Sequence, residues 1–255
     1  MGKIISISNQ KGGVGKTTTT VNLGASLGAS GKKVLIIDSD PQGNTTSGLG
    51  FNKKELKKSA YDVLENDTSA EEATIVTEFK NLSLIPSHIN LASADAGISL
   101  FSGKESKLKN KISHLKNSYD YIIIDCPPSL GIITINAFCA SDSILIPIQC
   151  EYYALEGLSQ LINTIKVVKR HHNAALDIEG ILMTMCDLRL NLTHQVMEEV
   201  KKNFPGKVFK TTIPRTVKLS EAPGFGKPVM YFSRLNKGNW AYKSLAKEII
   251  KNNNK

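Results

Sequence analysis

The chain has 255 residues, near the upper limit for one hydrophobic core, with 41% hydrophobic and 22% charged residues and a net charge of +9. This composition excludes a disordered or fibrous protein, and no stretch approaches the roughly 18 apolar residues of a membrane-spanning helix. The first residues lack the apolar segment of a secretory signal, so we expect a cytoplasmic protein.

Short β-branched runs alternate with longer helical patterns, which predicts an α/β fold: a single P-loop-type domain over 1–255 with a mostly parallel, twisted sheet and helices on both faces. The expected strands are Lys3–Ser8, Lys33–Asp38, Leu82–Pro86, Tyr119–Asp125, Ser143–Pro147, Ile178–Met185 and Val208–Ile213. The expected helices are Thr17–Ala29, Lys104–Lys116, Leu130–Cys139, Leu155–His171, Thr193–Phe204 and Asn239–Lys251. Residues 39–62 and 86–103 are expected to form loops and short helices, and 251–255 a frayed tail.

The strongest motif directly follows the first expected strand, where residues 11–18 read KGGVGKTT and open the first expected helix. This is the context of a P-loop, which binds nucleotide phosphates. The loop glycines, Gly12, Gly13 and Gly15, have no Cβ atom, so backbone N–H groups can surround phosphate oxygens, with the helix dipole behind them. The alternative is a glycine-rich turn that only caps a helix. That alternative would not require the Gly-Lys-Thr-Thr succession after a strand.

Two side chains of this loop are candidates for direct roles with a nucleotide. We expect Lys16 to reach the β and γ phosphates and the Thr17 hydroxyl to ligate Mg²⁺. The sequence departs from the usual P-loop pattern at one position, where Gln10 replaces the first glycine. Lys11 follows it, so the loop holds a second lysine.

Acidic residues end two of the expected strands. Asp38 ends the second strand and is followed closely by Asp40, and Asp125 ends the fourth strand. In a parallel sheet these positions meet the P-loop at the carboxyl edge, where such folds bind ligands. Each aspartate taken alone could be a turn or helix-capping residue. Together, beside a P-loop, they predict a site for a metal ion and an attacking water molecule.

The chain resembles the ParA/MinD group of ATPases in its deviant Walker A, Walker A′ and Walker B motifs. These motifs are KGGVGKTT at 11–18, VLIIDSDPQGN at 34–44 and YIIIDCPPSLG at 121–131. Three more segments resemble the chromosome-partitioning branch, ParA/Soj, so that the resemblance covers nearly the whole chain. They are PIQCEYYALEGLSQL at 147–161, MTMCDLRLN at 183–191 and IPRTVKLSEAPGFGKP at 213–228.

The resemblance implies an ATPase that uses ATP and Mg²⁺ and forms a homodimer around two ATP molecules. Lys11 matches the lysine that reaches the partner's nucleotide, Asp40 matches the residue that orients or activates the attacking water, and Asp38 and Asp125 match carboxylates of the Mg²⁺ shell. The catalytic candidates are therefore Lys11, Lys16 and Asp40. The residues that match nucleotide contacts are Lys11, Gly12, Gly13, Val14, Gly15, Lys16, Thr17 and Thr18, with Met185, Pro214, Arg215 and Thr216 expected near the adenine.

The resemblance also implies ATP-dependent, sequence-independent binding to double-stranded DNA, which places the protein on the nucleoid. Release would follow hydrolysis stimulated by a ParB/Spo0J-type partner, and some relatives also contact a replication initiator. Arg189 and Lys218 match the DNA-contact positions, although close relatives often have Arg at the second one. Arg215 lies near them in sequence and could serve DNA or nucleotide.

The charge distribution agrees with this expectation. Residues 1–150 hold 15 basic and 14 acidic side chains, whereas residues 151–255 hold 17 basic and 9 acidic ones, so the second part carries +8. A polyanionic partner is one explanation, and general solubility is the other.

Three other classes of protein compete with this interpretation. A MinD-like positioning ATPase would dock on membrane through a basic amphipathic C-terminal helix with bulky apolar residues at its end. This chain ends LAKEIIKNNNK, in which we expect Leu245, Ala246, Ile249 and Ile250 to pack on the core, and the Asn-rich end offers nothing to insert. An iron–sulfur reductase would need paired cysteines, and Cys126 has no obvious second partner. A structural protein with a vestigial loop is disfavoured because the motif residues are intact. We expect the four cysteines, Cys126, Cys139, Cys150 and Cys186, to be reduced thiols.

Overall fold

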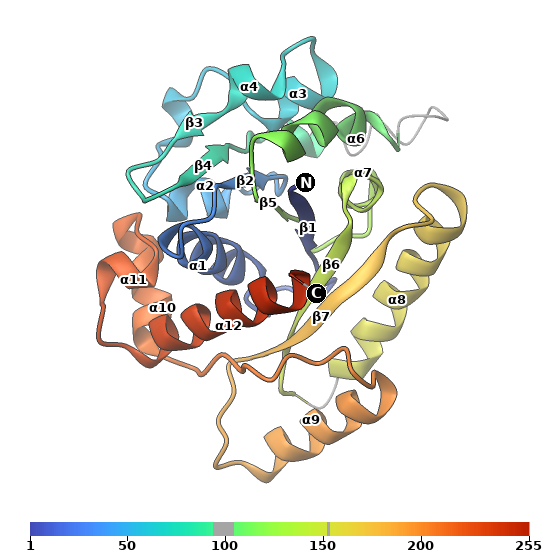
Figure 1. The fold of residues 1–255 in the computed structure, drawn as a ribbon, viewed down its shortest axis with the longest axis vertical. Helices are drawn as coiled ribbons and strands as arrows, with labels where there is room; N and C mark the ends of the chain where they lie inside the picture. Colours follow the sequence, from blue (N-terminus) through green and yellow to red (C-terminus); the bar gives the residue numbers. More distant parts are fainter. Residues whose placement is uncertain (94–104, 152–153, 255) are drawn as a thin grey trace.

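The strands form one sheet in the order β3-β4-β2-β5-β1-β6-β7 in the computed structural model, which describes residues 1–93, 105–151 and 154–254 (Figure 1). The strands are β1 Lys3–Ile7, β2 Val34–Asp38, β3 Ile75–Val76, β4 Leu82–Ile85, β5 Tyr121–Asp125, β6 Ser143–Gln149 and β7 Asp177–Thr184. All neighbours are parallel except β3, a two-residue edge strand antiparallel to β4 that the sequence did not predict. The predicted α/β fold is confirmed.

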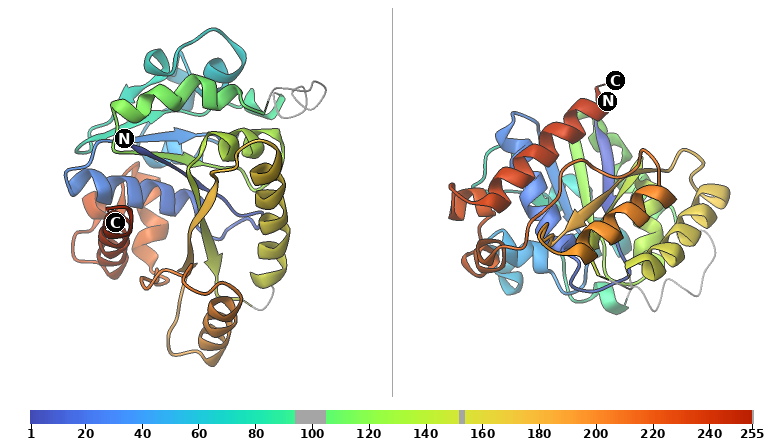
Figure 2. Two further views of the ribbon diagram at one scale, coloured as in Figure 1. Left: turned by 45° about the vertical axis from the view of Figure 1, so that its right-hand side comes forward. Right: turned by 90° about the horizontal axis from the view of Figure 1, so that it is seen from below.

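Helices cover both faces of the sheet (Figure 2). The α-helices are α1 Lys16–Ala29, α2 Asn44–Gly48, α3 Ala60–Glu65, α4 Ala70–Ala73, α6 Lys107–Ile112, α7 Ile132–Ala140, α8 Ala154–His171, α9 Asn191–Asn203, α10 Val217–Glu221, α11 Val229–Phe232 and α12 Lys237–Asn253. Short 3₁₀ helices are η1 Lys53–Glu55, η2 Ser113–Asn117 and η3 Ala222–Phe225. Helices α1, α10, α11 and α12 pack on one face, and α3, α4 and α6 to α9 on the other.

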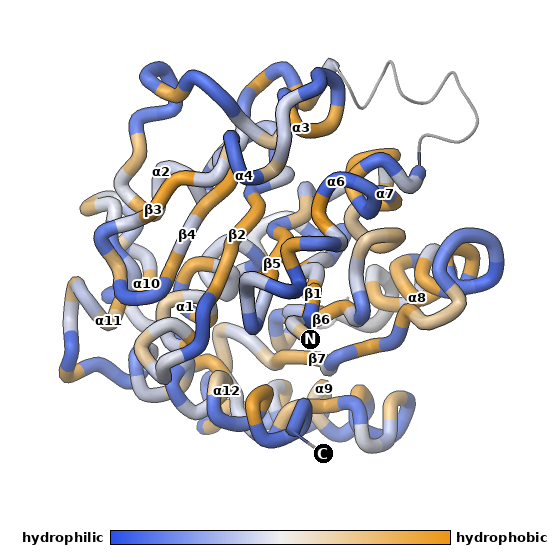
Figure 3. Tube along the Cα trace, turned by 45° about the horizontal axis from the view of Figure 1, so that its top comes forward, coloured by the Kyte–Doolittle hydropathy of each residue, from blue (hydrophilic) through white to orange (hydrophobic). Residues whose placement is uncertain are grey.

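Alternate side chains of each central strand enter different cores. Ile4 of β1 belongs to the core under α7 and α8, whereas Ile5 and Ile7 belong to the core under α1 and α12. This follows from the two-residue period of a strand, and it explains why the strands read as continuous apolar runs. Figure 3 shows β2 and β5 coloured hydrophobic over most of their length.

The strand order brings the ends of β1, β2 and β5 together. Ile7 pairs with Asp125, and Asp38 pairs with Asp125 in the register of the neighbouring strands. All three strands are parallel, so the loop after β1 and the two aspartates lie at the same carboxyl edge. The site predicted from the sequence is thus assembled by the sheet itself.

The structure gives more detail than the prediction for the helix expected over 104–116 and for the two expected irregular segments. The helix expected over 104–116 divides into α6 and η2, and its first residue lies outside the described residues, as do 94–103 of the expected irregular segment. The other irregular segment, 39–62, contains α2, η1 and the beginning of α3. Among the described helices, none is long and apolar enough to cross a membrane.

The strand predicted at 208–213 is wrong, because this segment meets β7 through separate backbone hydrogen bonds and isolated bridges and not through a continuous ladder. Ile181 pairs with Val208 in one such bridge. Between the bridges, the amides of Lys210 and Thr211 donate to the carboxylate of Glu248 on α12, at 2.8 and 3.0 Å. Since that carboxylate takes the hydrogen bonds of two successive amides, no regular ladder with β7 forms.

The frayed tail predicted over 251–255 is wrong for residues 251–253, since α12 continues to Asn253, and residue 255 lies outside the described residues. The Asn253 side chain accepts a hydrogen bond from Lys3 Nζ at 2.6 Å and donates one to Glu179 at 3.0 Å. These contacts fix the last helical turn against β1 and β7. An asparagine-rich sequence predicts fraying only when it has no such tertiary partners.

Candidate nucleotide and DNA site

The loop between β1 and α1 has the backbone conformation of a phosphate cradle. Gly13 and Gly15 have φ angles of +76° and +91°, in the left-handed region that glycine adopts without strain. A Cβ atom on Gly12 or Gly13 would meet nothing within 4 Å, so the loop is open on that side. The loop is tied to the sheet by Thr184, whose hydroxyl donates to the carbonyl of Val14 at 2.8 Å.

Lys16, the first residue of α1, is only 8% exposed, and its ammonium donates to the carbonyl of Lys11 at 3.2 Å across the loop. Within the described residues it forms no ion pair with a carboxylate. Burial lowers the pKa of Lys16, while the charges of Asp125 and Asp40 oppose that shift. A buried ammonium without an ion-pair partner fits an anionic ligand.

Asp125 is fully buried and accepts hydrogen bonds from three threonine hydroxyls. Thr17 and Thr45 donate to Oδ2 at 2.9 and 2.7 Å, and Thr20 donates to Oδ1 at 3.1 Å. Burial raises the pKa of Asp125 to about 6, and these hydroxyls act against the increase. The carboxylate therefore orients Thr17, the expected metal ligand, from the neighbouring strand.

Asp38 lies beside Asp125 in the sheet and has its own set of donors. The amide and hydroxyl of Thr46 donate to Oδ2 at 2.8 and 2.7 Å, and the amide of Asp40 donates to Oδ1 at 3.3 Å. Burial, followed by the charge of Asp125, raises the pKa of Asp38 to about 8. Asp38 is therefore protonated more readily than an exposed aspartate.

Asp40 is held in the turn that follows β2. Its Oδ1 accepts from the amide of Gln42 at 2.9 Å, and its carbonyl accepts from the hydroxyl of Ser87. Its negative charge acts to raise the pKa values of Lys16, Asp38 and Asp125. Asp40 is therefore close to all three, at the centre of the site.

Lys11 extends away from its own loop toward the end of β6. Its ammonium lies 2.5 Å from the carboxylate of Glu151, and both side chains are roughly half exposed. The loop backbone is fixed below it, because Asn9 accepts from the Lys11 amide and donates to the carbonyl of Pro147. The structure thus separates the two lysines: Lys16 is buried in the loop, and Lys11 is at the surface.

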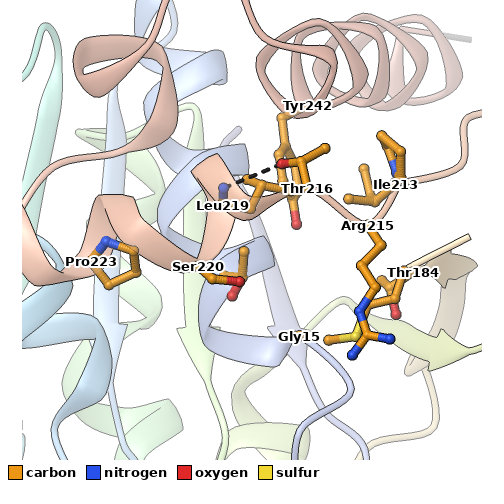
Figure 4. Close-up of a pocket in the computed structure, with 12 residues that line it drawn as sticks. Gly15, Thr184, Ile213, Arg215, Thr216, Leu219, Ser220, Pro223 and Tyr242 are labelled. Atoms are coloured by element: carbon orange, nitrogen blue, oxygen red, sulfur yellow. Dashed lines mark hydrogen bonds between the residues drawn. The ribbon is translucent and has the colours of Figure 1, made fainter.

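The four residues expected near adenine lie together. Met185, Pro214, Arg215 and Thr216 line a pocket of about 290 Å³ beside the P-loop. Its other lining residues are Gly15, Thr18, Thr184, Ile213, Leu219, Ser220, Pro223 and Tyr242. Figure 4 shows the Arg215 side chain extending through this pocket toward Gly15. Residues from four separate parts of the sequence therefore form one cavity.

The expected DNA-contact residues differ in their surroundings. Arg189 has an 88% exposed side chain but ion-pairs with Asp187 at 2.6 Å. Lys218 pairs with Glu221 at 2.8 Å and lies 5.5 Å from the centre of the Phe232 ring.

Two of the three basic side chains share a surface. Arg189 and Arg215 line a groove of about 770 Å³ next to the pocket beside the P-loop, whereas Lys218 lies outside that groove. Lys237 also lines it. The sequence analysis missed Lys237 because no local pattern connects the start of the last helix with the other two residues.

A family model described as "AAA domain" matches residues 2–178. The chain is 55% identical over 252 residues to the sporulation initiation inhibitor protein Soj of Bacillus subtilis (strain 168), covering 99% of this chain and all of that protein. The chain belongs to the ParA/Soj family. The resemblance predicted from its motifs is confirmed.

A further relative supports the family, and a solved structure supports the fold. The chromosome partitioning protein ParA of Myxococcus xanthus (strain DK1622) is 49% identical, over 98% of this chain and 89% of that protein. The crystal structure of cobyrinic acid a,c-diamide synthase from Mycobacterium smegmatis, with bound ATP analogue and magnesium, is 34% identical with a TM-score of 0.85, covering 97% and 93% of the two chains. The family is therefore that of P-loop ATPases named for chromosome partitioning.

The sequence analysis of this ParA/Soj-family chain missed several polar residues of the site. Thr20, Thr45 and Thr46 hold the two carboxyls, and Glu151 holds Lys11. The spacing from Thr17 to Thr20 on a helix could have indicated a shared face. Thr45 and Glu151 have partners 80 and 140 positions away, so no local signal points to them. Thr46 lies only 8 positions from Asp38, but no helical or strand pattern relates the two.

Proposed function

We propose that the chain is an ATPase that dimerises when it binds ATP, binds double-stranded DNA without sequence preference and releases the DNA after hydrolysis. Stimulation of hydrolysis by a ParB-type partner completes the cycle, and DNA binding places the protein on the nucleoid. One observation carries the ATPase step: the buried Lys16 ammonium has no carboxylate ion pair among the residues that the structure describes, and it lies in a glycine loop beside Thr17 and Asp125.

The phosphates of ATP would take the place opposite the Lys16 ammonium. The loop amides and the amino end of α1 would bind the phosphate oxygens, and the pocket around Met185 and Arg215 would hold the adenosine part. The Thr184 hydroxyl supports this arrangement by fixing the loop to β7 at the pocket wall. The choice of ATP as the nucleotide rests on the family resemblance.

The residues at the sheet edge fit a magnesium ion. The Thr17 hydroxyl and the carboxyls of Asp38 and Asp125 are hard oxygen donors, which Mg²⁺ prefers. The described residues contain no group of three or more His, Cys, Asp and Glu able to hold a metal alone. This agrees with a Mg²⁺ that also needs phosphate and water oxygens. When bound, Mg²⁺ neutralises charge that develops on the transferred phosphoryl group.

Two side chains would act on the reaction itself. Asp40, which its turn holds near Lys16, Asp38 and Asp125, would accept a hydrogen bond from the attacking water and orient it. Lys11 would leave Glu151 and reach the nucleotide of a second copy of the chain, where its charge stabilises the transition state. Hydrolysis would then require the dimer.

The groove lined by Arg189, Arg215 and Lys237 supports the DNA-binding step. Each of these cations can contact backbone phosphates, which gives binding without sequence preference. Two such faces in a dimer would contact twice as many phosphates as one. The affinity would therefore depend on the nucleotide state, and release would follow hydrolysis.

The deciding experiment measures ATP turnover of the purified chain with and without random-sequence duplex DNA and the ParB-type partner of the same genome. We expect slow turnover that rises when both are present, and none with Lys16→Ala. DNA binding that is equal with and without ATP would contradict the proposal. Binding to liposomes in place of DNA would favour the MinD-like alternative.

A further inference from the structure

We propose that Cys150 and Cys186 form a site of reversible oxidation, at which a peroxide converts the two thiols into an intramolecular disulfide. The two Sγ atoms lie 3.4 Å apart and share a hydrogen bond, although 36 positions separate the residues in sequence. Both are free cysteines in this structure. Neither belongs to the nucleotide or metal site described above.

The ends of two neighbouring strands bring these thiols together. Gln149 of β6 pairs with Thr184 of β7, and each cysteine follows shortly after its strand. Met185, which lies between Thr184 and Cys186, has a φ angle of +51°, so the chain turns after β7. The amide of Cys186 then donates to the carbonyl of Ile213 at 2.9 Å. The sheet and this hydrogen bond hold the backbone on both sides of the pair.

The two thiols differ in a way that suits sequential oxidation. Cys150 is half-buried and Cys186 is 6% exposed, and both line the groove that also contains Arg189 and Arg215. The hydrogen bond with Cys186 lowers the pKa of Cys150, and the same bond together with burial raises the pKa of Cys186. Cys150 is thus the better thiolate and is reached from the groove.

The other two cysteines lack these properties. Cys126 and Cys139 are both buried, and burial raises their pKa values to about 12 and about 11. Neither lines the groove. Reaction with a small oxidant should therefore begin at Cys150 and leave this pair reduced.

The chemistry requires one molecule of peroxide. The Cys150 thiolate attacks one oxygen, the O–O bond breaks, and hydroxide leaves and takes up the thiol proton as water, so that Cys150 becomes a sulfenic acid. Cys186 then loses its proton and attacks the Cys150 sulfur, forming the S–S bond and displacing hydroxide, which leaves as a second water. The two thiols lose two electrons, and the peroxide gains them. The sulfurs must approach from 3.4 Å to about 2.05 Å.

The disulfide would also constrain the neighbouring site residues, a consequence that rests on the proposed function. Glu151, next to Cys150, holds Lys11, and Met185, next to Cys186, lines the adenine pocket. A disulfide between Cys150 and Cys186 should restrict Glu151, so that Glu151 keeps its ion pair with Lys11 of the same chain. We therefore expect oxidation to lower the fraction of dimer formed with ATP, and reduction to restore it.

The test treats the purified protein with hydrogen peroxide and counts free thiols before and after. We expect the count to fall from the four of the sequence to two, with the loss of two hydrogen atoms in the intact mass. Digestion without reductant should give one peptide pair joined through Cys150 and Cys186, and dithiothreitol should separate it. Four remaining thiols, a bridge to Cys126 or Cys139, or a bridge between two molecules would overturn the proposal.

Two variants make the assignment independent of peptide mapping. Cys150→Ala and Cys186→Ala should each form no bridge, whereas the matched control Cys139→Ala should lose two of its three thiols. Dimerisation with ATP is measured on the same samples. Failure of the reduced protein to dimerise would contradict the proposed function but not the disulfide, whereas equal dimerisation of both forms would overturn only the predicted effect of oxidation.

Discussion

The ammonium of Lys11 lies 2.5 Å from the carboxylate of Glu151, a residue 140 positions away at the end of β6. Both side chains are partly exposed to solvent. An exposed ion pair of this kind contributes only about 0.2–1 kcal/mol, so it can break when a stronger anion becomes available. The pair therefore holds Lys11 outside its own phosphate loop without fixing it there.

Removal of either partner of this pair should affect dimerisation in opposite directions. Lys11→Ala should still bind ATP but lose the ATP-dependent dimer, because the charge that reaches the second nucleotide is gone. Glu151→Gln should form the dimer at lower ATP concentration, because Lys11 is no longer held. Size-exclusion chromatography with light scattering checks both, and a normal dimer of Lys11→Ala would remove the support for its role between subunits.

Lys16→Ala should lower nucleotide affinity and abolish turnover. Its buried ammonium is the cation placed to face the phosphates, and loss of one such group at a transition state costs about 100-fold or more in rate. Binding of a fluorescent ATP analogue measures the first effect. Lys33→Ala, a change of equal charge at the opposite edge of the sheet, is the control and should bind normally.

Asp40→Ala should separate binding from chemistry. We expect ATP binding to persist and turnover to fall by about 100-fold or more, in the range observed for general acid–base groups. The comparison is with Asp67→Ala, an exposed aspartate far from the site in sequence. Turnover that survives in Asp40→Ala would assign water positioning to another residue.

The DNA groove predicts a pair of opposite effects. Arg215→Ala should weaken binding to random-sequence duplex DNA and reduce the slope of log affinity against log salt by about 1. Asp187→Asn should strengthen binding, because it releases the guanidinium of Arg189 from its ion pair. Fluorescence anisotropy with ATP over a salt series gives both slopes. An affinity of Arg215→Ala equal to that of the unaltered chain would exclude this groove.

The two buried carboxyls predict the pH dependence of stability without metal or nucleotide. The pKa of Asp38 is raised by burial to about 8 and that of Asp125 to about 6, against 3.8 for the ordinary side chain. Between about pH 4 and pH 8 the folded state therefore holds protons that the unfolded chain has lost, so the free energy of unfolding should fall as pH rises.

Urea unfolding at several pH values in the presence of a chelator measures how the free energy of unfolding changes with pH. The free energy of unfolding of Asp38→Ala should change less with pH than that of the unaltered chain, whatever the overall stability of the variant. The free energy of unfolding of Asp67→Ala should change with pH as much as that of the unaltered chain. A free energy of unfolding that increases from pH 5 to pH 8 would contradict the shifted pKa values.

The sequence alone determined the fold and the core of the site. Continuous apolar runs ending in Asp38 and Asp125 are recognisable locally, because a strand buried on both faces has no polar alternation. The glycine loop with Lys16 and Thr17 is equally local. The edge strand β3 and the irregular segment at 208–213 could not be predicted, because short strands and extended segments depend on which neighbour takes their hydrogen bonds.

The tertiary structure alone decided which side chains meet across the sheet. Thr45 reaches Asp125, Glu151 reaches Lys11, and Cys150 reaches Cys186 because the strand order β2-β5-β1-β6-β7 brings their loops to one edge. Thr46 reaches Asp38 because the chain turns back after β2. Each of these contacts joins residues that no helical or strand period relates. A sequence specifies such partners only through the packing of the whole chain, since their energies are small beside those of the core that positions them.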